Sequence, residues 1–292
     1  MADRHSVSHA IYLSLLMVIL ASTAVVAAKL ASRTASTAAI VSVQFAICTL
    51  LCLPTTLRPG LSNLRTTRLG LHLFRGAAGV LGFYLYYGVL EYIPLVDAML
   101  LRQTAPLAVP LVMWAWNREK VPASAWLPLT IGFVGVAIIL RPSPEGLSWW
   151  HAAGLMSGLA LAISMVATFR LATTEPDSRI LFYYFTLSLL CVLPFGVDDF
   201  GSIRWQDWLA VVYIGVSIYF TLALYTRAYA IAPASAIAPV NYLVIVLGGF
   251  WGWAIWGQVP DLWSLVGSAL VIAGGLLTLL LARSRPVVTA PE

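Results

Sequence analysis

Runs of about twenty apolar residues, broken by short polar stretches, recur along the whole chain. A helix needs roughly 20 residues to cross the hydrocarbon core of a bilayer, so each run is long enough for one crossing. The composition agrees, because 60% of the 292 residues are hydrophobic and only 10% are charged, against about 25% in soluble domains. The short alternating segments typical of a membrane β-barrel do not occur. We therefore predict an all-α membrane protein.

The polar breaks divide the chain into ten predicted transmembrane helices. They cover residues 10–28, 38–55, 69–90, 95–116, 123–140, 151–171, 180–197, 208–228, 235–256 and 262–282. Basic residues between the runs gather on the side that holds both termini, namely Arg58, Arg65, Arg68, Arg118, Lys120, Arg170 and Arg179. Because cytoplasmic loops of membrane proteins carry an excess of Lys and Arg, we expect both termini to be cytoplasmic.

The two halves of the chain resemble each other. Shifting the sequence by 139 residues places Pro94 on Pro233 and Gly135 on Gly274 without a gap. The chain is therefore interpreted as two five-helix repeats, residues 10–141 and 151–282. Because five is an odd number, the second repeat must enter the membrane from the opposite face. Inverted repeats of this kind are typical of secondary transporters, which bind their substrate near the midplane between the repeats.

The fourth run carries a charged residue in its middle, where a charge has a high free-energy cost. Arg102 lies in the middle of residues 95–116, where a charged side chain in a membrane helix costs about 2.5 to 3.5 kcal/mol. Its side chain should therefore face a protein interior or a wet cavity. In the repeat, Arg102 and Gln103 fall on Asn241 and Tyr242, so both halves place polar groups at comparable depth. This match favours a polar substrate-binding chamber over an arginine that only satisfies nearby carbonyls.

Other polar and aromatic residues have two interpretations each. Tyr84 and Tyr225 are predicted to line the chamber, although membrane tyrosines more often lie at the headgroups. Arg75 and Arg227 lie within about two turns of the cytoplasmic helix ends. They could form a gate or vestibule for an anionic substrate, or they could reach the headgroups as anchors. Asp97, which falls on Ala236, is either an interfacial carboxylate or a proton-coupling group.

Several functions lack their sequence signals. There is no phosphate-binding GxxxxGK[ST] loop and no HExxH or comparable ligand cluster, so we expect no cofactor, no metal and no catalytic residue. The basic residues lie at helix ends and report topology, so no nucleic-acid partner is expected. An intramembrane enzyme stays open as a second class, but it needs a nucleophile and base that the sequence does not assign.

Short motifs in the first half resemble the EamA-type transporters of the drug/metabolite transporter superfamily. They are Phe74-Arg75-Gly76, Tyr92-Ile93-Pro94-Leu95, Ala105-Pro106-Leu107, Glu119-Lys120-Val121, residues 131–136 and residues 138–142. The second half matches less closely, with Gln258 where the family usually has an acidic residue. The resemblance implies a ten-helix secondary transporter in the bacterial inner membrane, with its site on the helices that carry Arg102, Gln103, Asn241 and Tyr242.

The predicted partners are the lipid bilayer and a small-molecule substrate, and a homodimer is left open. We expect a small polar metabolite as substrate, with an amino acid or related carboxylated compound favoured because an arginine can hold a carboxylate with two hydrogen bonds. Compounds like nucleosides, S-adenosylmethionine or flavins remain alternatives, because the same aromatic side chains could stack a ring. Export is one direction such a protein can serve.

Overall fold

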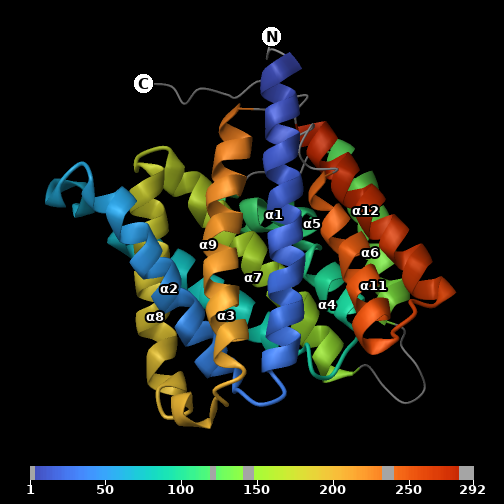
Figure 1. Ribbon diagram of the computed structural model, residues 1–292. Helices are drawn as coiled ribbons and strands as arrows, with labels where there is room; N and C mark the ends of the chain where they lie inside the picture. The colour runs from blue at the N-terminus through green and yellow to red at the C-terminus, as the bar shows by residue number, and fades with distance from the viewer. Residues whose placement is uncertain (1–3, 119–122, 141–147, 232–239, 283–292) are drawn as a thin grey trace.

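A computed structural model describes residues 4–118, 123–140, 148–231 and 240–282, and within them it contains helices and no strand (Figure 1). The helices are α1 (Arg4–Ala31), α2 (Thr37–Leu57), α3 (Leu69–Gly88), α4 (Leu95–Arg102), α5 (Ala105–Asn117), α6 (Ala123–Leu140), α7 (Trp149–Ala172), α8 (Asp177–Gly196), α9 (Trp208–Ile231), α11 (Leu243–Trp256) and α12 (Leu262–Ala282). Single turns of 3₁₀-helix, η1 (Leu61–Leu64) and η2 (Phe200–Ser202), lie in two of the loops.

Six of the described segments are long and apolar enough to cross a membrane, and this confirms the prediction of an all-α membrane protein. They are Ser8–Ala31, Thr37–Leu57, Leu95–Trp116, Trp149–Ala172, Asp177–Gly196 and Trp208–Ala228. Shorter apolar segments lie at Trp126–Ile138, Leu243–Trp256 and Leu262–Leu277. Since lipid offers no hydrogen bonds, a backbone that crosses it must satisfy its own polar groups, as these helices do.

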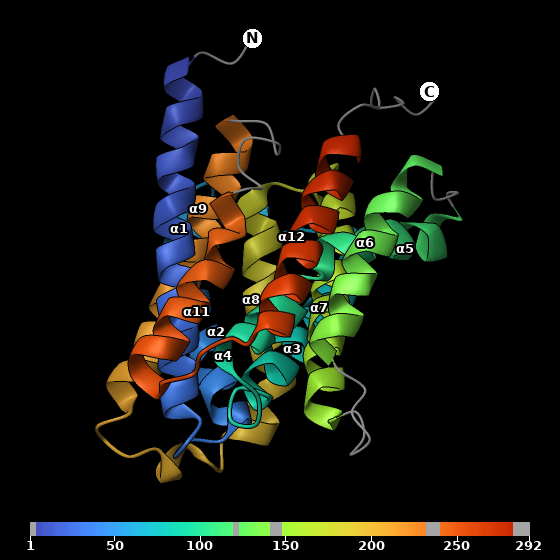
Figure 2. The same cartoon turned by 90° about the vertical axis from the view of Figure 1, so that its right-hand side faces the viewer.

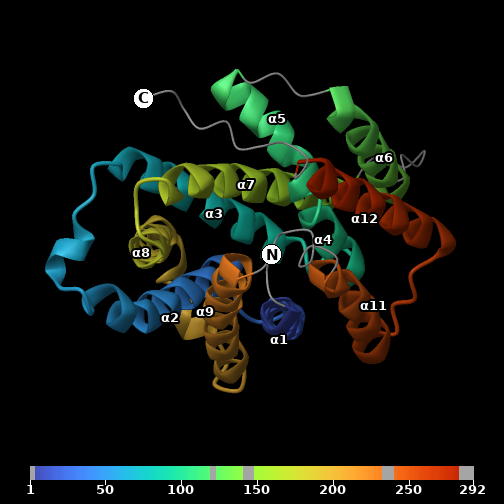
Figure 3. The same ribbon diagram turned by 90° about the horizontal axis from the view of Figure 1, so that it is seen from above.

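The helices pack mainly in pairs that are distant in the sequence. α1 packs against α9, α3 against α7, α2 against α8 and α6 against α12. Seen from above, α6 and α12 stand together at one side of the bundle, beside α5 (Figure 3). α1 begins and α12 ends at the same end of the bundle, which we call the terminal face (Figure 2). The other end is called the opposite face.

The fourth run differs from its prediction in one respect. The sequence predicts a continuous helix over residues 95–116, whereas α4 ends at Arg102 and α5 begins at Ala105. Pro106 explains the interruption, because proline has no N–H to donate to the carbonyl of the residue four positions earlier, Arg102. The chain turns tightly there, with Thr104 N donating to Leu101 O at 3.3 Å, a 3₁₀-type bond.

A glycine of α7 lets the break approach closely. A side chain at Gly158 would place its Cβ 2.5 Å from the carbonyl oxygen of Leu101 and 2.5 Å from the Thr104 hydroxyl. Gly248 of α11 contacts the Met99 sulfur on another side of α4. Small residues allow helix backbones to come together in lipid, where packing drives association. α4 and the break are therefore enclosed by helices from the second half of the chain.

Candidate functional site

Arg102 lies at the end of α4, beside the break. Its Nη1 donates a hydrogen bond of 3.0 Å to the carbonyl oxygen of Gly82 in α3. The central carbon of the guanidinium lies 4.4 Å from the ring centroid of Phe83 and 4.6 Å from that of Tyr86. Two rings of α3 thus flank the cation, an arrangement worth about 0.5–2 kcal/mol for each ring.

Arg102 has no acidic partner among the residues that the structure describes. A guanidinium carries five N–H donors, and the described residues accept one of them. The residue is only partly exposed, and removing a cation from water without a counter-charge costs several kcal/mol. The remaining donors can hold a carboxylate or phosphate with two parallel bonds. The site is therefore suited to an anionic group.

Gln103 and Asn241 lie where they can add hydrogen bonds. Gln103 follows α4 directly and is half-buried, with its backbone N–H donating to Met99 O at 3.0 Å. Asn241 is also half-buried and lies just before α11, which packs against α4. The packing of these two helices brings together the segments that carry the two predicted polar pairs.

The predicted tyrosines have different surroundings. Tyr242 is buried, and its ring extends toward α12, because a side chain at Gly275 would collide with the Tyr242 hydroxyl. Tyr84 lies between Phe83 and Tyr86 in the sequence, but its side chain is 43% exposed and does not share their contact with Arg102. Tyr225 is half-buried on α9. The rings that contact the Arg102 cation therefore belong to Phe83 and Tyr86, rather than to Tyr84.

Sequence reasoning missed Phe83 and Tyr86. They are spaced by three, and with Gly79 and Gly82 they follow the i, i+3, i+4, i+7 pattern of one helix face. That pattern could have placed both rings on the face of α3 whose glycines pack against α7 and α8. It could not have placed Arg102 above them, because a sequence does not show how a helix is rotated about its axis.

Arg75 is buried rather than exposed to headgroups. Its Nε donates to the Thr168 hydroxyl at 2.6 Å and its Nη1 to Ile180 O at 3.3 Å. Its guanidinium carbon lies 4.0 Å from the Tyr184 ring centroid. The side chain is 6% exposed, so it is not an interfacial anchor. Arg227 on α9 is exposed and keeps both interpretations.

Aromatic rings connect the two buried arginines. Tyr184, which contacts Arg75, lies 5.7 Å from Phe45, and Phe45 lies 5.8 Å from Phe83, which contacts Arg102. Both ring pairs meet edge to face, the arrangement that aromatic quadrupoles prefer. A continuous aromatic path from α8 through α2 to α3 therefore separates the two cations.

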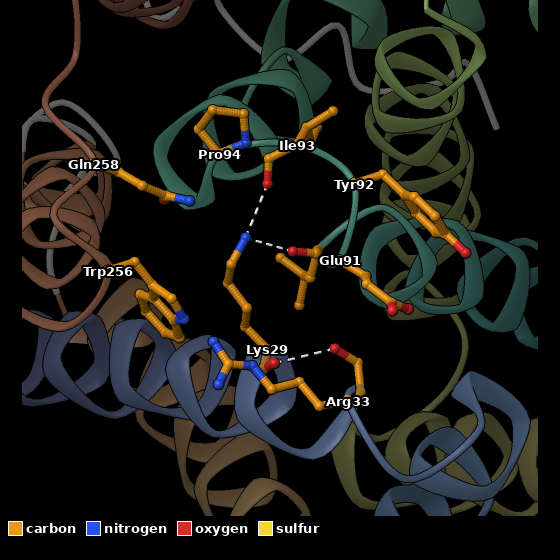
Figure 4. A pocket seen from close by; sticks show the side chains of 10 residues that line it. Lys29, Arg33, Glu91, Tyr92, Ile93, Pro94, Trp256 and Gln258 are labelled. Carbon is orange, nitrogen blue, oxygen red and sulfur yellow. Dashed lines mark hydrogen bonds between the residues drawn. The ribbon is translucent and has the colours of Figure 1, made fainter.

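A pocket of about 270 Å³ lies at the opposite face (Figure 4). It is lined by residues of α1, of the turn between α3 and α4, and of the end of α11 and the loop after it. Lys29 is buried there and donates to the carbonyl oxygens of Leu90 and, at 2.9 Å, of Ile93. Gln258 accepts a hydrogen bond of 3.2 Å from the backbone N–H of Leu95 at the start of α4. The loop after α11 is thus tied to the beginning of α4.

A carboxylate cluster joins two loops on the terminal face. Glu175 accepts hydrogen bonds from the Thr66 hydroxyl at 2.6 Å and from Arg179 Nη1 at 2.5 Å. Burial alone would raise the pKa of the Glu175 carboxyl, but these hydrogen bonds and the Arg179 charge lower it below its usual value. The loop before α3 and the loop before α8 are therefore held together by an ionised glutamate.

A second cluster plays the same part on the opposite face. Asp207 accepts a hydrogen bond of 2.6 Å from the Thr34 hydroxyl and one of 2.9 Å from Arg204 Nε. The bonds from Thr34 and Arg204 lower the pKa of the Asp207 carboxyl. The described residues contain no group of three or more His, Cys, Asp or Glu side chains that could hold a metal ion.

Comparison with known proteins gives consistent results. The sequence pattern of the EamA-like transporter family matches residues 8–141 and again residues 148–280. The pseudopaline exporter CntI of Pseudomonas aeruginosa is 31% identical over 253 residues, which cover 85% of this chain and 86% of the exporter. A riboflavin transporter of Vibrio cholerae is 28% identical over 79% of this chain and 78% of its own.

A more distant relative and a solved structure extend the comparison. An S-adenosylmethionine uptake transporter of Rickettsia bellii is 22% identical over 80% of each chain. A protein of known crystal structure has a TM-score of 0.62 with 20% sequence identity, over 95% of this chain and 98% of its own. At that identity the likeness concerns the fold alone. The names of these relatives refer to three different compounds, so the comparison does not identify one substrate class.

Proposed function

Because the chain belongs to the EamA-like transporter family, we propose that it is a secondary transporter for a small polar metabolite with an anionic group. It would work by alternating access in the bacterial inner membrane. An amino acid or a related carboxylated compound fits its site best. The observation that carries this choice is the Arg102 guanidinium, held by two rings and one carbonyl with no described acid beside it.

The proposed architecture is ten transmembrane helices in two inverted repeats, residues 10–141 and 151–282. The family pattern matches the chain twice, once in each of these segments. Packing supports the same division, because α1 against α9 has a counterpart in α7 against α3. Gly135 and Gly274, which correspond in the repeat, both lie in the contact between α6 and α12. Alternating access follows when two such halves exchange conformations.

We assign the substrate-binding roles as follows. Arg102 holds the anionic group with two hydrogen bonds, and Gln103 and Asn241 orient the rest of the molecule. Tyr225 lines the wall of the chamber from α9. Tyr242 supports the wall from behind, because its ring is directed toward α12.

Arg75 and Arg227 would serve the cytoplasmic side of the path. Arg75 contributes a fixed positive charge from inside the bundle, since its guanidinium is buried without an acidic partner among the described residues. Arg227, which is exposed, would attract the anion at the entrance. With both termini cytoplasmic, as the basic loops favour, Arg227 would face the cytoplasm. Export is one direction that transport can take, and the name of the Pseudomonas relative describes an exporter.

A second candidate substrate class has its own support. Phe83 and Tyr86 are buried beneath the Arg102 guanidinium, but Tyr84 is 43% exposed next to them and offers an aromatic face. Flat ring compounds stack on such faces. The riboflavin and S-adenosylmethionine transporters among the relatives are named for compounds with rings. A ring compound that also carries an anionic group would satisfy both the arginine and the aromatic side chains.

Ligand-dependent stabilisation of the purified protein tests the proposal. Melting temperatures are measured in detergent with a panel of amino acids, dicarboxylates, nucleosides, riboflavin and S-adenosylmethionine, because binding to the folded state raises apparent stability by mass action. Compounds that stabilise are then tested for saturable counterflow in proteoliposomes. Stabilisation and counterflow by anionic compounds are expected. Chemical conversion of a compound inside the vesicles, seen by mass spectrometry, would instead indicate an enzyme.

A further inference from the structure

Lys29 links α1 to the turn between α3 and α4 at the opposite face. Its side chain is 6% exposed, and its ammonium is bound by the carbonyl oxygens of Leu90 and Ile93. The same ammonium lies 5.6 Å from the ring centroid of Trp256 at the end of α11. The close view shows the lysine reaching from α1 to the turn before Pro94, with Trp256 and Gln258 on one side (Figure 4). One cation thus joins α1 to two other elements, the turn before α4 and the end of α11.

Arg170 makes a corresponding contact at the terminal face. It lies in the last turn of α7, and its guanidinium carbon is 4.8 Å from the ring centroid of Trp116 near the end of α5. Trp116 also packs edge to face on Phe74 of α3, with ring centroids 4.7 Å apart. The turn after α7 lies at the same end of the bundle as the start of α1 (Figure 1).

The two contacts join corresponding helix ends of the two halves of the chain. Lys29 ends the first helix of the first half, and Arg170 ends the first helix of the second half. Trp116 and Trp256 lie at the ends of the fourth helices. Each cation therefore contacts a tryptophan of the other half. The two tryptophans do not match residue for residue, because the shift of 139 places Trp116 on Ile255, but each lies in the last turn of the corresponding helix. A single such pair could be packing, but two related by the repeat are explained by a shared role.

We propose that Lys29 and Arg170 are gate residues, each closing one mouth of the transport path through its tryptophan. This inference rests on the proposed transporter function. The contact between Lys29 and Trp256 on the opposite face is the stronger of the two, because Lys29 also binds two backbone carbonyls. Arg170 is half-buried; its guanidinium lies over the Trp116 ring and makes no hydrogen bond or ion pair with the described residues. The mouth at the terminal face is thus held by fewer bonds.

The chemical nature of the Lys29 contacts explains how an anion would break them. Its partners are neutral carbonyl groups and an aromatic face. A carboxylate is a stronger acceptor for an ammonium than a carbonyl is, because it adds the attraction between two opposite full charges to the hydrogen bond. The adjoining pocket has room for such a group and also carries Arg33, although Glu91 partly offsets the positive charge. An anion leaving Arg102 would therefore displace the carbonyls and release α1 from the turn.

Thiol labelling from each side of the membrane tests this proposal without a known substrate. Cys48, Cys52 and Cys191 are replaced by alanine, and Gln103→Cys provides a reporter beside the break. An impermeant sulfonated methanethiosulfonate is added to sealed vesicles of either orientation. With Lys29→Met, labelling from the opposite face should rise at least about fivefold, while labelling from the terminal face falls. Arg170→Met should produce the reverse.

Matched variants separate gating from loss of fold. Lys29→Arg keeps the cation and should label like the parent. Arg33→Met removes a cation from the same pocket without breaking the Lys29 contacts, so labelling from the opposite face should not rise. Trp256→Leu should reproduce Lys29→Met, and it decides the question if Lys29→Met is not produced in folded form. Unchanged rates, or faster labelling from both faces at once, would overturn the gate assignment. Since labelling needs no transported compound, that result would leave the transporter proposal standing.

Discussion

Replacing Arg102 by methionine should separate binding from stability. If the guanidinium holds a carboxylate with two charge-assisted hydrogen bonds, each worth about 1.5–3 kcal/mol, Arg102→Met loses roughly 3–6 kcal/mol of binding free energy. At about 1.4 kcal/mol for a factor of ten, this weakens affinity by roughly 10² to 10⁴. The unliganded protein loses one hydrogen bond to Gly82 and two ring contacts. The variant also no longer carries the cost of keeping a cation away from water, which is several kcal/mol.

These opposing terms should nearly cancel in the unliganded protein, so its melting temperature should change little. Arg75→Met is the matched control, because Arg75 donates two hydrogen bonds and contacts a ring. That variant also removes a buried cation, but it leaves both the Thr168 hydroxyl and the Ile180 carbonyl without their donor, so its melting temperature should fall further than that of Arg102→Met. Counterflow and ligand-induced stabilisation are measured for both variants. The reasoning is refuted if Arg102→Met unfolds the protein while its folded fraction still binds anions like the parent.

Three further predictions concern other parts of the structure. Glu175→Gln should remove the acid-side loss of melting temperature: the Glu175 pKa is lowered in the folded state, so its stabilisation is complete above the unfolded pKa and lost as the pH falls through the folded one. An identical pH profile for the variant would contradict this. Gly158→Ala should lower stability by about 1–3 kcal/mol, measured by denaturation in detergent, because its Cβ meets backbone at 2.5 Å; unchanged stability would show that α7 can shift. Phe83→Leu should weaken anion binding about twofold to thirtyfold in thermal shift titrations, and equal affinity would exclude a role for that ring.

The helical character of the chain could be predicted because lipid restricts the backbone so strongly. Apolar runs located α1, α2, α7 and α9 to within a few residues, apart from α1 starting earlier. The break after Arg102 was not predicted, although Pro106 gave the chemical reason for it. A proline in a membrane helix can be accommodated by a kink or by an interruption, and the close approach of Gly158 depends on packing that the sequence does not show.

The site was predictable only where the free-energy cost of one residue points to it. Arg102 was identified because a cation in a membrane helix needs a reason. The sequence pointed to Tyr84 as an aromatic neighbour of Arg102, whereas the structure has Phe83 and Tyr86 in contact with it. Each residue turns a helix by about 100°, so a shift of one or two positions changes which side chain faces inward. Arg75 shows the same limit: its position near a helix end allowed snorkelling, while the orientation of α3 buries it against α7 and α8.

The interruption between α4 and α5 has a consequence for how such proteins diversify. Arg102 and Gln103 occupy the end of one helix and the start of a turn, so exchanging their side chains leaves the main-chain hydrogen bonds of both helices in place. α12 packs against both α4 and α5, so the α6–α12 pair lies against the break. Under the proposed function, substitutions at Arg102 and Gln103 would change which substrate binds while the backbone of both helices stays the same.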